Sequence, residues 1–303
     1  MTPGPSTAAT AAPVATASPW VQLISDYVAL TKPKVQSLLL FTTATTMLIA
    51  GSPSLGLILV TCLGGYLSAG GAGAINHAYD RDIDARMART ATRPIPAGRV
   101  SPRAAIIFGC TLAALAVVLL SVAVNPLAAA LSLSGFLGYV FVYTMWLKRR
   151  TPQNIVIGGA AGAVPPLVGW AAVEGTVTGT ALVLFFIVFF WTPPHFWALS
   201  LLMKEEYAKV GVPMLPVVRG ERETRKQILL YSVLLYAVTQ LPFSGGGFGL
   251  IYLFASLALN AGFIGLAIRL YRRADRPSAL RVYLYSLAYL AALFAAMVVD
   301  VKI

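Results

Sequence analysis

Charged residues are scarce in this sequence. They make up 11% of its 303 residues, whereas hydrophobic residues make up 58%. An ordinary soluble domain carries about 25% charged residues, so this balance excludes that class of protein. We therefore predict an all-α, polytopic membrane protein, built as a bundle of transmembrane helices.

Cysteine and histidine are also rare. The two cysteines, Cys62 and Cys110, lie inside apolar stretches and have no CxxC spacing, which is typical of small core residues. This argues against a cysteine metal site. Only two histidines occur, His77 and His195, so either one would be conspicuous in a functional site.

The first eighteen residues contain no charged side chain and are rich in Ala, Thr and Pro. They lack the basic start and apolar core of a secretory signal, and they lack the arginines of a mitochondrial transit peptide. We expect residues 1–30 to form a disordered tail and a cytoplasmic lead-in. We expect residues 31–303 to form a single membrane domain.

Long apolar runs, separated by turn residues, predict nine membrane-spanning helices. Their ends are set only approximately by the apolar runs and the helix breakers. The predicted spans are 35–51, 55–76, 104–123, 127–147, 154–172, 178–200, 227–243, 247–268 and 279–299.

Basic residues gather in alternate links between these spans. The links carry all but one of the 23 Lys and Arg residues, and the exception is Lys302. Because positively charged loops stay in the cytoplasm, we predict a cytoplasmic N-terminus and a site on the cytoplasmic side of a bacterial plasma (inner) membrane. Topology also explains the net charge of +12, so we expect the lipid bilayer as a partner and no nucleic acid.

A row of oxygen ligands follows the second predicted span. Asn76, Asp80 and Asp84 are spaced at i, i+4 and i+8. Each step of four residues turns a helix only about 40° past a full revolution, so the three side chains share one face. Mg²⁺ prefers such hard oxygens and completes its octahedron with water and substrate phosphate. The row therefore predicts a metal site that binds a diphosphate.

Arginines follow the acidic row. Their planar guanidinium groups suit phosphate oxygens, although each could instead be a topology charge in a solvated loop. Asp82 lies roughly 200° from Asp80 around the helix, so we expect it to face away from the metal. The arginines are Arg86, Arg89, Arg93 and Arg99.

The same residues carry a resemblance to a known family. The chain reads Asn76-x-x-x-Asp80-x-x-x-Asp84, contains the string Asp-Arg-Asp-Ile-Asp-Ala-Arg-Met-x-Arg-Thr, and continues with Arg93-Pro and Gly98. This pattern resembles the first signature of the UbiA-type intramembrane prenyltransferase superfamily. The longer string is most similar to its heme-farnesylating branch.

The resemblance implies a reaction and its partners. In this branch the farnesyl group of farnesyl diphosphate is transferred to a vinyl group of heme b, which gives heme O and diphosphate for terminal oxidases. It implies Mg²⁺ held by Asn76, Asp80 and Asp84, with Arg93 as a further catalytic residue beside the departing diphosphate. It also suggests heme A synthase or oxidase assembly proteins as candidate partners.

Further candidate substrate contacts come from the same resemblance. Before the first span, Lys32 and Lys34 are either topology charges or neighbours of the diphosphate, and Lys34 is taken as the candidate. The superfamily often places a Tyr and a Lys four residues apart after the fourth span, whereas Tyr143 and Lys148 are five apart here. Asn154 opens a segment, Asn-Ile-Val-Ile-Gly-Gly, that resembles the heme branch.

A second charged link follows the sixth span, from Lys204 to Pro216. In the wider superfamily this link carries a second Asp-x-x-x-Asp, but here Glu206 has Val210 four residues on. A second Mg²⁺ would therefore have one protein ligand, Glu205 or Glu206, or would be held mainly by the diphosphate. Phosphate or substrate contacts are expected from Lys204, Tyr207 and Lys209.

His195 lies in the segment Trp191-Thr-Pro-Pro-His-Phe-Trp197, among aromatic residues. A histidine in this place suits a heme-iron ligand or a base near the reacting carbon. The alternative is a histidine that is hydrogen-bonded inside the bundle. His77 points roughly 100° away from its neighbour Asn76 on the helical wheel, which makes it a weaker candidate.

Three other functions are weighed against heme farnesylation. The first is the same chemistry on an aromatic quinone precursor, which the missing second Asp pair argues against. The second is a membrane transporter, which usually needs ionisable groups inside its spans, whereas the charges here gather at one membrane face. The third is a heme-delivery factor that leaves the heme unchanged.

Overall fold

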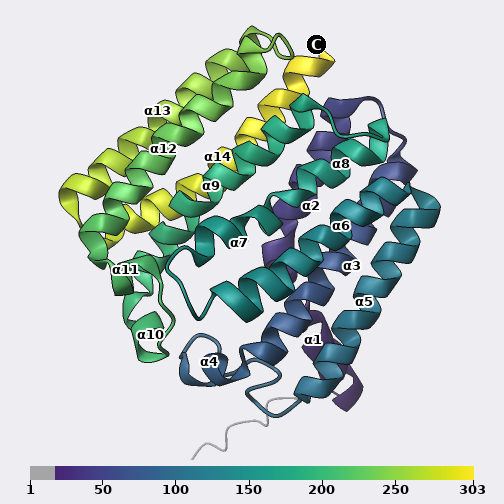
Figure 1. The fold of residues 1–303 in the computed structure, drawn as a ribbon, viewed down its shortest axis with the longest axis vertical. Coiled ribbons are helices and arrows are strands. Elements are labelled where there is room, and N and C mark those ends of the chain that lie inside the picture. Colours follow the sequence, from purple (N-terminus) through teal and green to yellow (C-terminus); the bar gives the residue numbers. More distant parts are fainter. Residues whose placement is uncertain (1–17) are drawn as a thin grey trace, which may run out of the picture.

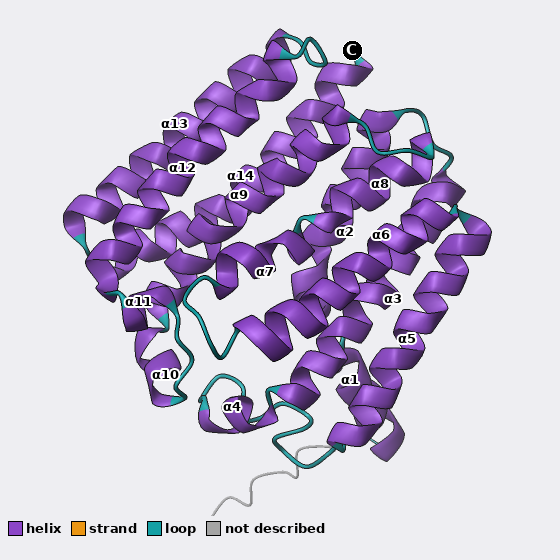
Figure 2. Ribbon diagram, viewed as in Figure 1, coloured by secondary structure: helices purple, strands orange, loops and turns teal. Residues whose placement is uncertain are grey.

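Long apolar runs form the helices that cross the membrane. The computed structural model describes residues 18–303, and this part of the chain is helical and contains no strand (Figures 1 and 2). The expected disordered tail at 1–17 lies outside the described residues. The helices of the first part are α1 (Pro19–Leu30), α2 (Pro33–Ala50), α3 (Leu55–Tyr79), α4 (Arg81–Arg86), α5 (Pro102–Ala123) and α6 (Pro126–Leu137).

The remaining elements begin with a π-helix that continues directly from α6. They are η1 (Gly138–Leu147), α7 (Asn154–Gly162), α8 (Val164–Glu174), α9 (Gly179–Leu202), α10 (Lys204–Lys209), α11 (Leu215–Val218), α12 (Gly220–Ser244), α13 (Leu250–Arg273) and α14 (Arg276–Lys302).

Local sequence explains where many of these helices begin. The side chains of Ser101, Asn125 and Asp275 each accept a hydrogen bond from the backbone N–H three residues on, which satisfies a donor at the helix start. Proline follows each cap at the first or second helical position, where its missing N–H costs nothing. Ser54 and Thr178 cap α3 and α9 in the same way.

The chain is a multi-pass membrane protein. Within the described part, eight helical stretches are long and apolar enough to cross a membrane. They match eight of the nine predicted spans, with α6 and η1 forming one stretch and α7 and α8 another. The remaining predicted span, 35–51, is the 18-residue helix α2, which packs between α8 and α14 but is less apolar. Residues 19–30, expected only as a lead-in, form α1.

The helices pack as two connected groups. In one group, α3 makes its most extensive contacts with α5; in the other, α9 contacts α12 and α14. Contacts of α2 with α14 and of α7 and α8 with α9 join the groups. The short helices α4 and α10 lie at one end of the bundle and the C-terminus lies at the opposite end (Figure 1). The polar links therefore gather at one face.

Candidate metal and diphosphate site

The predicted row of oxygen ligands keeps its helical alignment in the structure. Asn76 lies in the last turn of α3, Asp80 links α3 to α4, and Asp84 lies in α4. The Asp80 N–H donates to the Asn76 carbonyl at 2.9 Å, and the Asp84 N–H donates to the Asp80 carbonyl at 2.8 Å. The i→i+4 pattern thus continues through the junction, and the three side chains stay on one face.

All three side chains are buried, and the first two are bonded to each other. Only 1% of Asp80 and 4% of Asn76 is exposed. Asn76 Nδ2 donates to Asp80 Oδ2 at 2.8 Å and to Thr144 Oγ1 of η1 at 3.1 Å. Lys148 Nζ forms an ion pair with Asp80 Oδ2. The buried carboxylate is thereby neutralised by a lysine that comes from another helix.

Asp84 has its own cationic partner. Arg93 Nη1 lies 2.7 Å from Asp84 Oδ2. Thr90 Oγ1 donates to the Asp84 carbonyl at 2.9 Å, which fixes the start of the loop that carries Arg93. The structure therefore brings Arg93 to the acidic row, next to the position that the sequence assigns to diphosphate.

Lys32 occupies the place for which the sequence analysis selected Lys34. Lys32 Nζ donates to Asn76 Oδ1 at 2.5 Å, whereas Lys34 is exposed. Lys32 has φ 54°, a left-handed conformation that is costly for a residue with a side chain and that turns the chain sharply from α1 into α2. Burial, reinforced by the charges of Lys148 and Arg93, lowers the pKa of its ammonium group to about 7.

The π-helix η1 aligns Tyr143 with Lys148. In an α-helix the residue four positions on lies above a given side chain, but in a π-helix it is the residue five positions on. The Lys148 N–H donates to the Tyr143 carbonyl at 2.9 Å, which is this i→i+5 bond. In the π-helix, the five-residue spacing of Tyr143 and Lys148 therefore places them on neighbouring turns, as a four-residue spacing does in an α-helix. The Tyr139 ring lies 5.3 Å from the Tyr143 ring.

Arg149 holds α4 in place, a role that sequence reasoning missed. Its Nη1 and Nη2 bind the two carboxylate oxygens of Asp82 at 2.8 Å and 2.7 Å. Nη2 also donates to the Tyr79 carbonyl at 3.1 Å, and the guanidinium lies 5.0 Å from the centre of the Tyr79 ring. The hydrogen bond from Arg149 lowers the pKa of Asp82 to about 2. Asp82 is exposed and paired, and Arg149 Nη2 also lies 3.5 Å from Asp80 Oδ1, so one guanidinium group joins Asp82 to the row.

The second charged link approaches the first. Val210 and Met214 share one buried apolar cluster with Ile83 and Met87 from the acidic segment. Burial raises the pKa of the Tyr207 hydroxyl, while the nearby charges of Lys148 and Arg89 act in the opposite direction. Tyr207 thus lies within the field of the basic residues of the first link.

Only some predicted residues of the second link are placed for binding. Glu206 Oε2 is buried and has no hydrogen-bond partner among residues 18–303, which leaves this oxygen available as a ligand atom. Lys204 instead pairs with Glu221 at 3.0 Å at the start of α12, and Lys209 is exposed. Neither lysine contacts the acidic row in the structure. Asn154 donates to the carbonyls of Thr151 and Lys148, so it supports the turn after Lys148.

His195 lies inside the bundle, in a stack of aromatic rings. Its ring is 4.5 Å from Trp191 and 5.0 Å from Tyr283, nearly parallel to both. Its Nδ1 is 2.7 Å from Ser286 Oγ of α14. His195 is therefore hydrogen-bonded inside the bundle, as the alternative interpretation predicts. Its Nε2 is the ring nitrogen that this bond does not use. His77 is buried, and neither of its ring nitrogens has a hydrogen-bond partner in the described part of the chain.

The donor set of the row fits Mg²⁺. Within residues 18–303, no three His, Cys, Asp or Glu side chains cluster. The row instead offers two carboxylates and one amide oxygen, and Mg²⁺ usually takes only one or two carboxylates from protein when phosphate and water complete its shell. The buried carboxylates suit a bound cation, and the lysine and arginine side chains that face them suit a bound anion.

Comparison with known proteins gives a family and a set of relatives. The model of the UbiA prenyltransferase family matches residues 39–295. A protoheme IX farnesyltransferase of Chloroflexus aurantiacus is 55% identical over 283 residues, which is 93% of this chain and 48% of the relative. Another, from Thermus thermophilus, is 56% identical over 91% of this chain and 46% of the relative. The chain spans about half the length of these curated relatives.

A third relative is matched over nearly its whole length. This protoheme IX farnesyltransferase of Symbiobacterium thermophilum is 54% identical over 284 residues, 92% of this chain and 95% of the relative. Among solved structures, a digeranylgeranylglyceryl phosphate synthase superposes with a TM-score of 0.77 at 20% identity and covers 93% of this chain and 100% of that chain. A UbiA homolog from Archaeoglobus fulgidus bound to DMAPP and Mg²⁺ gives 0.64 at 17% identity, covering 90% and 99%. These structures share the fold.

Proposed function

The chain belongs to the UbiA prenyltransferase family, and from this premise we propose that it transfers the farnesyl group of farnesyl diphosphate to a vinyl group of protoheme IX. The products are heme O and diphosphate, and Mg²⁺ is the cofactor. The observation that carries the proposal is the buried row of Asn76, Asp80 and Asp84, with Lys32, Lys148 and Arg93 paired to it.

The choice of acceptor is supported by the relatives. Proteins named protoheme IX farnesyltransferase are 54% to 56% identical to this chain over more than nine tenths of its length. The second link agrees with this choice, because it lacks the Asp pair expected for a quinone-type acceptor: Glu206 is followed four residues later by Val210. The Archaeoglobus structure with DMAPP and Mg²⁺ supports a divalent ion in this fold.

Different residues of the site would bind the metal ion and the diphosphate. Asn76, Asp80 and Asp84 would hold Mg²⁺, with Glu206 available to a second ion, and the bound metal would supply positive charge at the departing diphosphate. Lys32, Lys148 and Arg93 would then bind phosphate oxygens that take the place of their present carboxylate and amide partners. Tyr143 lies near Asp80, and Tyr207 lies near Lys148 and Arg93, so the two rings would screen the allylic carbon from water.

The reaction balances without a redox partner. The bond between C1 of the farnesyl group and oxygen breaks, and its electron pair leaves with diphosphate. The vinyl π electrons of heme form the new carbon–carbon bond. The resulting cation beside the porphyrin takes a hydroxyl from water, and one proton is released.

The heme made by expressing cells tests the acceptor. Cells that produce the chain should yield heme with the added mass of a farnesyl group and water, identified by mass spectrometry. Asp80→Asn should yield unmodified heme b from a folded, extractable protein. Glu174→Gln, which changes an exposed carboxylate at the far end of α8, should keep the product.

Two further measurements distinguish the other functions. Purified protein given labelled farnesyl diphosphate should modify heme and leave hydroxybenzoate unmodified. If only hydroxybenzoate became labelled, heme would be the wrong acceptor. Binding of farnesyl diphosphate should be lost in a chelator and restored by Mg²⁺. Equal binding in both buffers would remove the metal from the proposal, and solute flux without release of diphosphate would indicate a transporter.

A further inference from the structure

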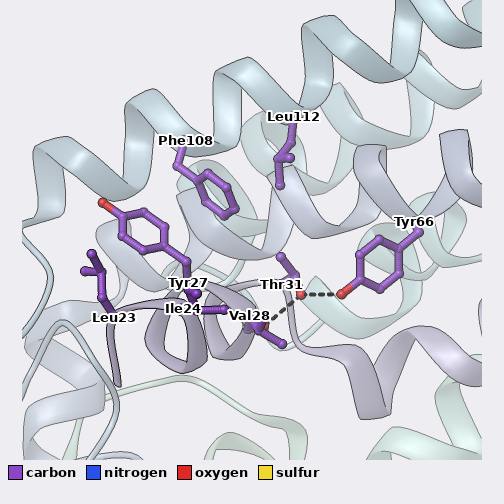
Figure 3. Close-up of a pocket in the computed structure, with 8 residues that line it drawn as sticks. All are labelled: Leu23, Ile24, Tyr27, Val28, Thr31, Tyr66, Phe108 and Leu112. Carbon is purple, nitrogen blue, oxygen red and sulfur yellow. Dashed lines mark hydrogen bonds between the residues drawn. The ribbon is translucent and has the colours of Figure 1, made fainter. Parts of the chain in front are cut away.

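An apolar groove of about 400 Å³ lies on the outer side of the bundle, and none of its lining residues belongs to the acidic row. Its walls come from three helices: α1 contributes Leu23, Ile24 and Tyr27, α3 contributes Tyr66, and α5 contributes Phe108 and Leu112 (Figure 3). The Tyr27 and Phe108 rings meet edge to face at 4.9 Å and form one end of the groove.

The polar groups at the other end satisfy one another. Thr31 Oγ1 donates to the Val28 carbonyl at 2.8 Å, so it accepts from the Tyr66 hydroxyl, which lies 2.9 Å away (Figure 3). Because these hydroxyls are already used, the groove presents mainly carbon to whatever enters it. A polar or ionic ligand would lose hydration there without gaining hydrogen bonds.

The helix that covers the groove exposes a broad apolar surface. Trp20 and Val21, which do not line the groove, have exposed fractions of 75% and 57%. In water this surface would be costly, at about 25 cal/mol for each Å². Both α3 and α5 are membrane-spanning by length and composition, so the groove is continuous with the face of the bundle that meets lipid.

We propose that this groove binds a hydrocarbon chain of a bilayer phospholipid, and that the bound lipid seats α1 against α3 and α5. An acyl chain fits this groove by chemistry, because the groove is lined mainly by carbon. It also fits by position, because the groove opens at a membrane-facing surface and the outer side of α1 is apolar. The proposal depends on the membrane-facing geometry and not on the acceptor of the transferase reaction.

The opposite side of α1 connects the lipid site to the catalytic loop. Asp26 is buried, and its two carboxylate oxygens accept hydrogen bonds from Arg99 Nε at 2.9 Å and 3.1 Å. The Arg99 guanidinium lowers the pKa of this carboxyl. Arg99 lies on the same loop as Arg93, which pairs with Asp84. A lipid that seats α1 would therefore also steady the loop that carries Arg93.

Quenching by brominated lipid chains tests the position of α1 in the intact protein. A fluorophore is attached at Val21→Cys, an exposed position of α1 outside the groove, after Cys62 and Cys110 are replaced by alanine, and the protein is placed in bilayers with dibrominated acyl chains. We expect strong quenching, similar to that at Val118→Cys on the exposed face of α5. Quenching as weak as at Arg150→Cys, in an exposed cytoplasmic-end loop, would overturn the proposal.

A groove-filling variant tests the bound chain itself. Leu112→Trp should displace the lipid, so that native mass spectrometry after detergent exchange shows loss of one tightly bound phospholipid per chain. Leu115→Trp, at an exposed position outside the groove on the same helix, should keep that lipid. Equal retention in the two variants, or a retained isoprenoid diphosphate instead of a phospholipid, would contradict the proposal. If Leu112→Trp fails to fold, the quenching experiment decides alone.

Discussion

Asp80 and Asp84 show how a membrane bundle accommodates buried carboxylates. An unpaired charge buried beside hydrocarbon is strongly unfavourable, so buried acids are paired or bind a metal. Here Lys148 and Arg93 supply the pairing, and Lys32 binds the neighbouring amide oxygen. The same cations are the natural ligands of a diphosphate. The proposed site would thus be stable before a diphosphate binds and would already carry the charges that such a ligand requires.

Arg149 is expected to position the acidic row through α4. Because its fork binds both oxygens of Asp82 and the Tyr79 carbonyl, Arg149→Lys would keep the charge but lose the paired geometry. We expect kcat/KM to fall roughly tenfold, the value of one charge-assisted hydrogen bond. The Mg²⁺ concentration needed for half-maximal activity should rise as well.

The matched control is Arg150→Lys, because Arg150 is adjacent but exposed. It should behave as the unchanged protein in the same Mg²⁺ titration. A charge swap, Asp82→Arg with Arg149→Asp, should recover part of the Mg²⁺ affinity that either single change loses. If the single variants lose stability but titrate normally with Mg²⁺, Arg149 supports the fold alone.

His195 is expected to present a free lone pair at Nε2. Ser286 Oγ donates to the Tyr283 carbonyl at 2.6 Å, so it must accept from Nδ1 of His195, and the proton is inferred to lie on Nδ1. A neutral imidazole held in this way is the form that binds heme iron or takes a proton. We expect His195→Ala to weaken heme binding roughly tenfold while farnesyl diphosphate binding changes little.

Heme titration of purified protein measures this difference. Tyr283→Phe keeps the stacked ring and its backbone carbonyl, so it should titrate normally. Ser286→Ala removes the acceptor of the Nδ1 proton and should give a smaller loss than His195→Ala. An unchanged heme titration in His195→Ala would reduce this residue to packing inside the bundle.

At the scale of the elements, the apolar runs predict the long helices well. Eight predicted spans correspond to membrane-length helices, and the ends differ by only a few residues where a cap and a proline are visible in the sequence. Helix α1 was missed as an element because it is short and its stability comes from packing on α3 and α5. The π-helix was also missed, since its register is set by the contacts of Tyr143 and Lys148 with other elements.

The contact of α3 with α5 depends on two glycines that meet directly. A Cβ added at Gly71 would lie 2.5 Å from the Gly109 carbonyl oxygen, and one added at Gly109 would lie 2.7 Å from that of Gly71. Because the obstacle is backbone in both cases, the helices must separate if a side chain is added. We expect Gly71→Ala to destabilise the protein by ~1–3 kcal/mol and to lower activity, since α3 carries the start of the acidic row.

Thermal unfolding in detergent measures this change against a control on the same helix. At Gly65 an added Cβ would meet only Leu40 at 3.7 Å, an ordinary contact. Gly65→Ala should therefore be neutral or slightly stabilising, because alanine favours the helix. Similar melting temperatures for the two variants would show that the α3–α5 contact can relax.

At the scale of the whole molecule, sequence predicts the alignment of the acidic row better than it predicts the partners of that row. Helical spacing placed Asn76, Asp80 and Asp84 on one face, because that relation is local. The choice of Lys34 over Lys32 and the omission of Arg149 have one cause. Which basic side chain reaches the row depends on how α2 and η1 pack on α3, between residues 44 to 70 positions apart.

One contact at the far end of the bundle joins the end of α14 to the residue that follows α2. Lys302, the basic residue outside the cytoplasmic pattern, donates to the Gly51 carbonyl at 2.6 Å. Gly51 follows α2, so the end of α14 lies at the end of the bundle that α2 reaches. Since Lys32 immediately precedes α2 at its other end, the start of α2 and the C-terminus lie at opposite ends of the bundle.

We therefore expect a cytoplasmic N-terminus and an external C-terminus. A green fluorescent protein fused after Ile303 should remain dark when exported, and alkaline phosphatase fused there should be active. The same reporters fused after Ala274, in the basic link between α13 and α14, should give the opposite result, because that link carries arginines that stay inside. Fluorescence from the Ile303 fusion, together with phosphatase activity after Ala274, would contradict this orientation. Because Lys302 contacts Gly51 at one end of α2 and Lys32 contacts Asn76 at the other, the acidic row would then face the outside.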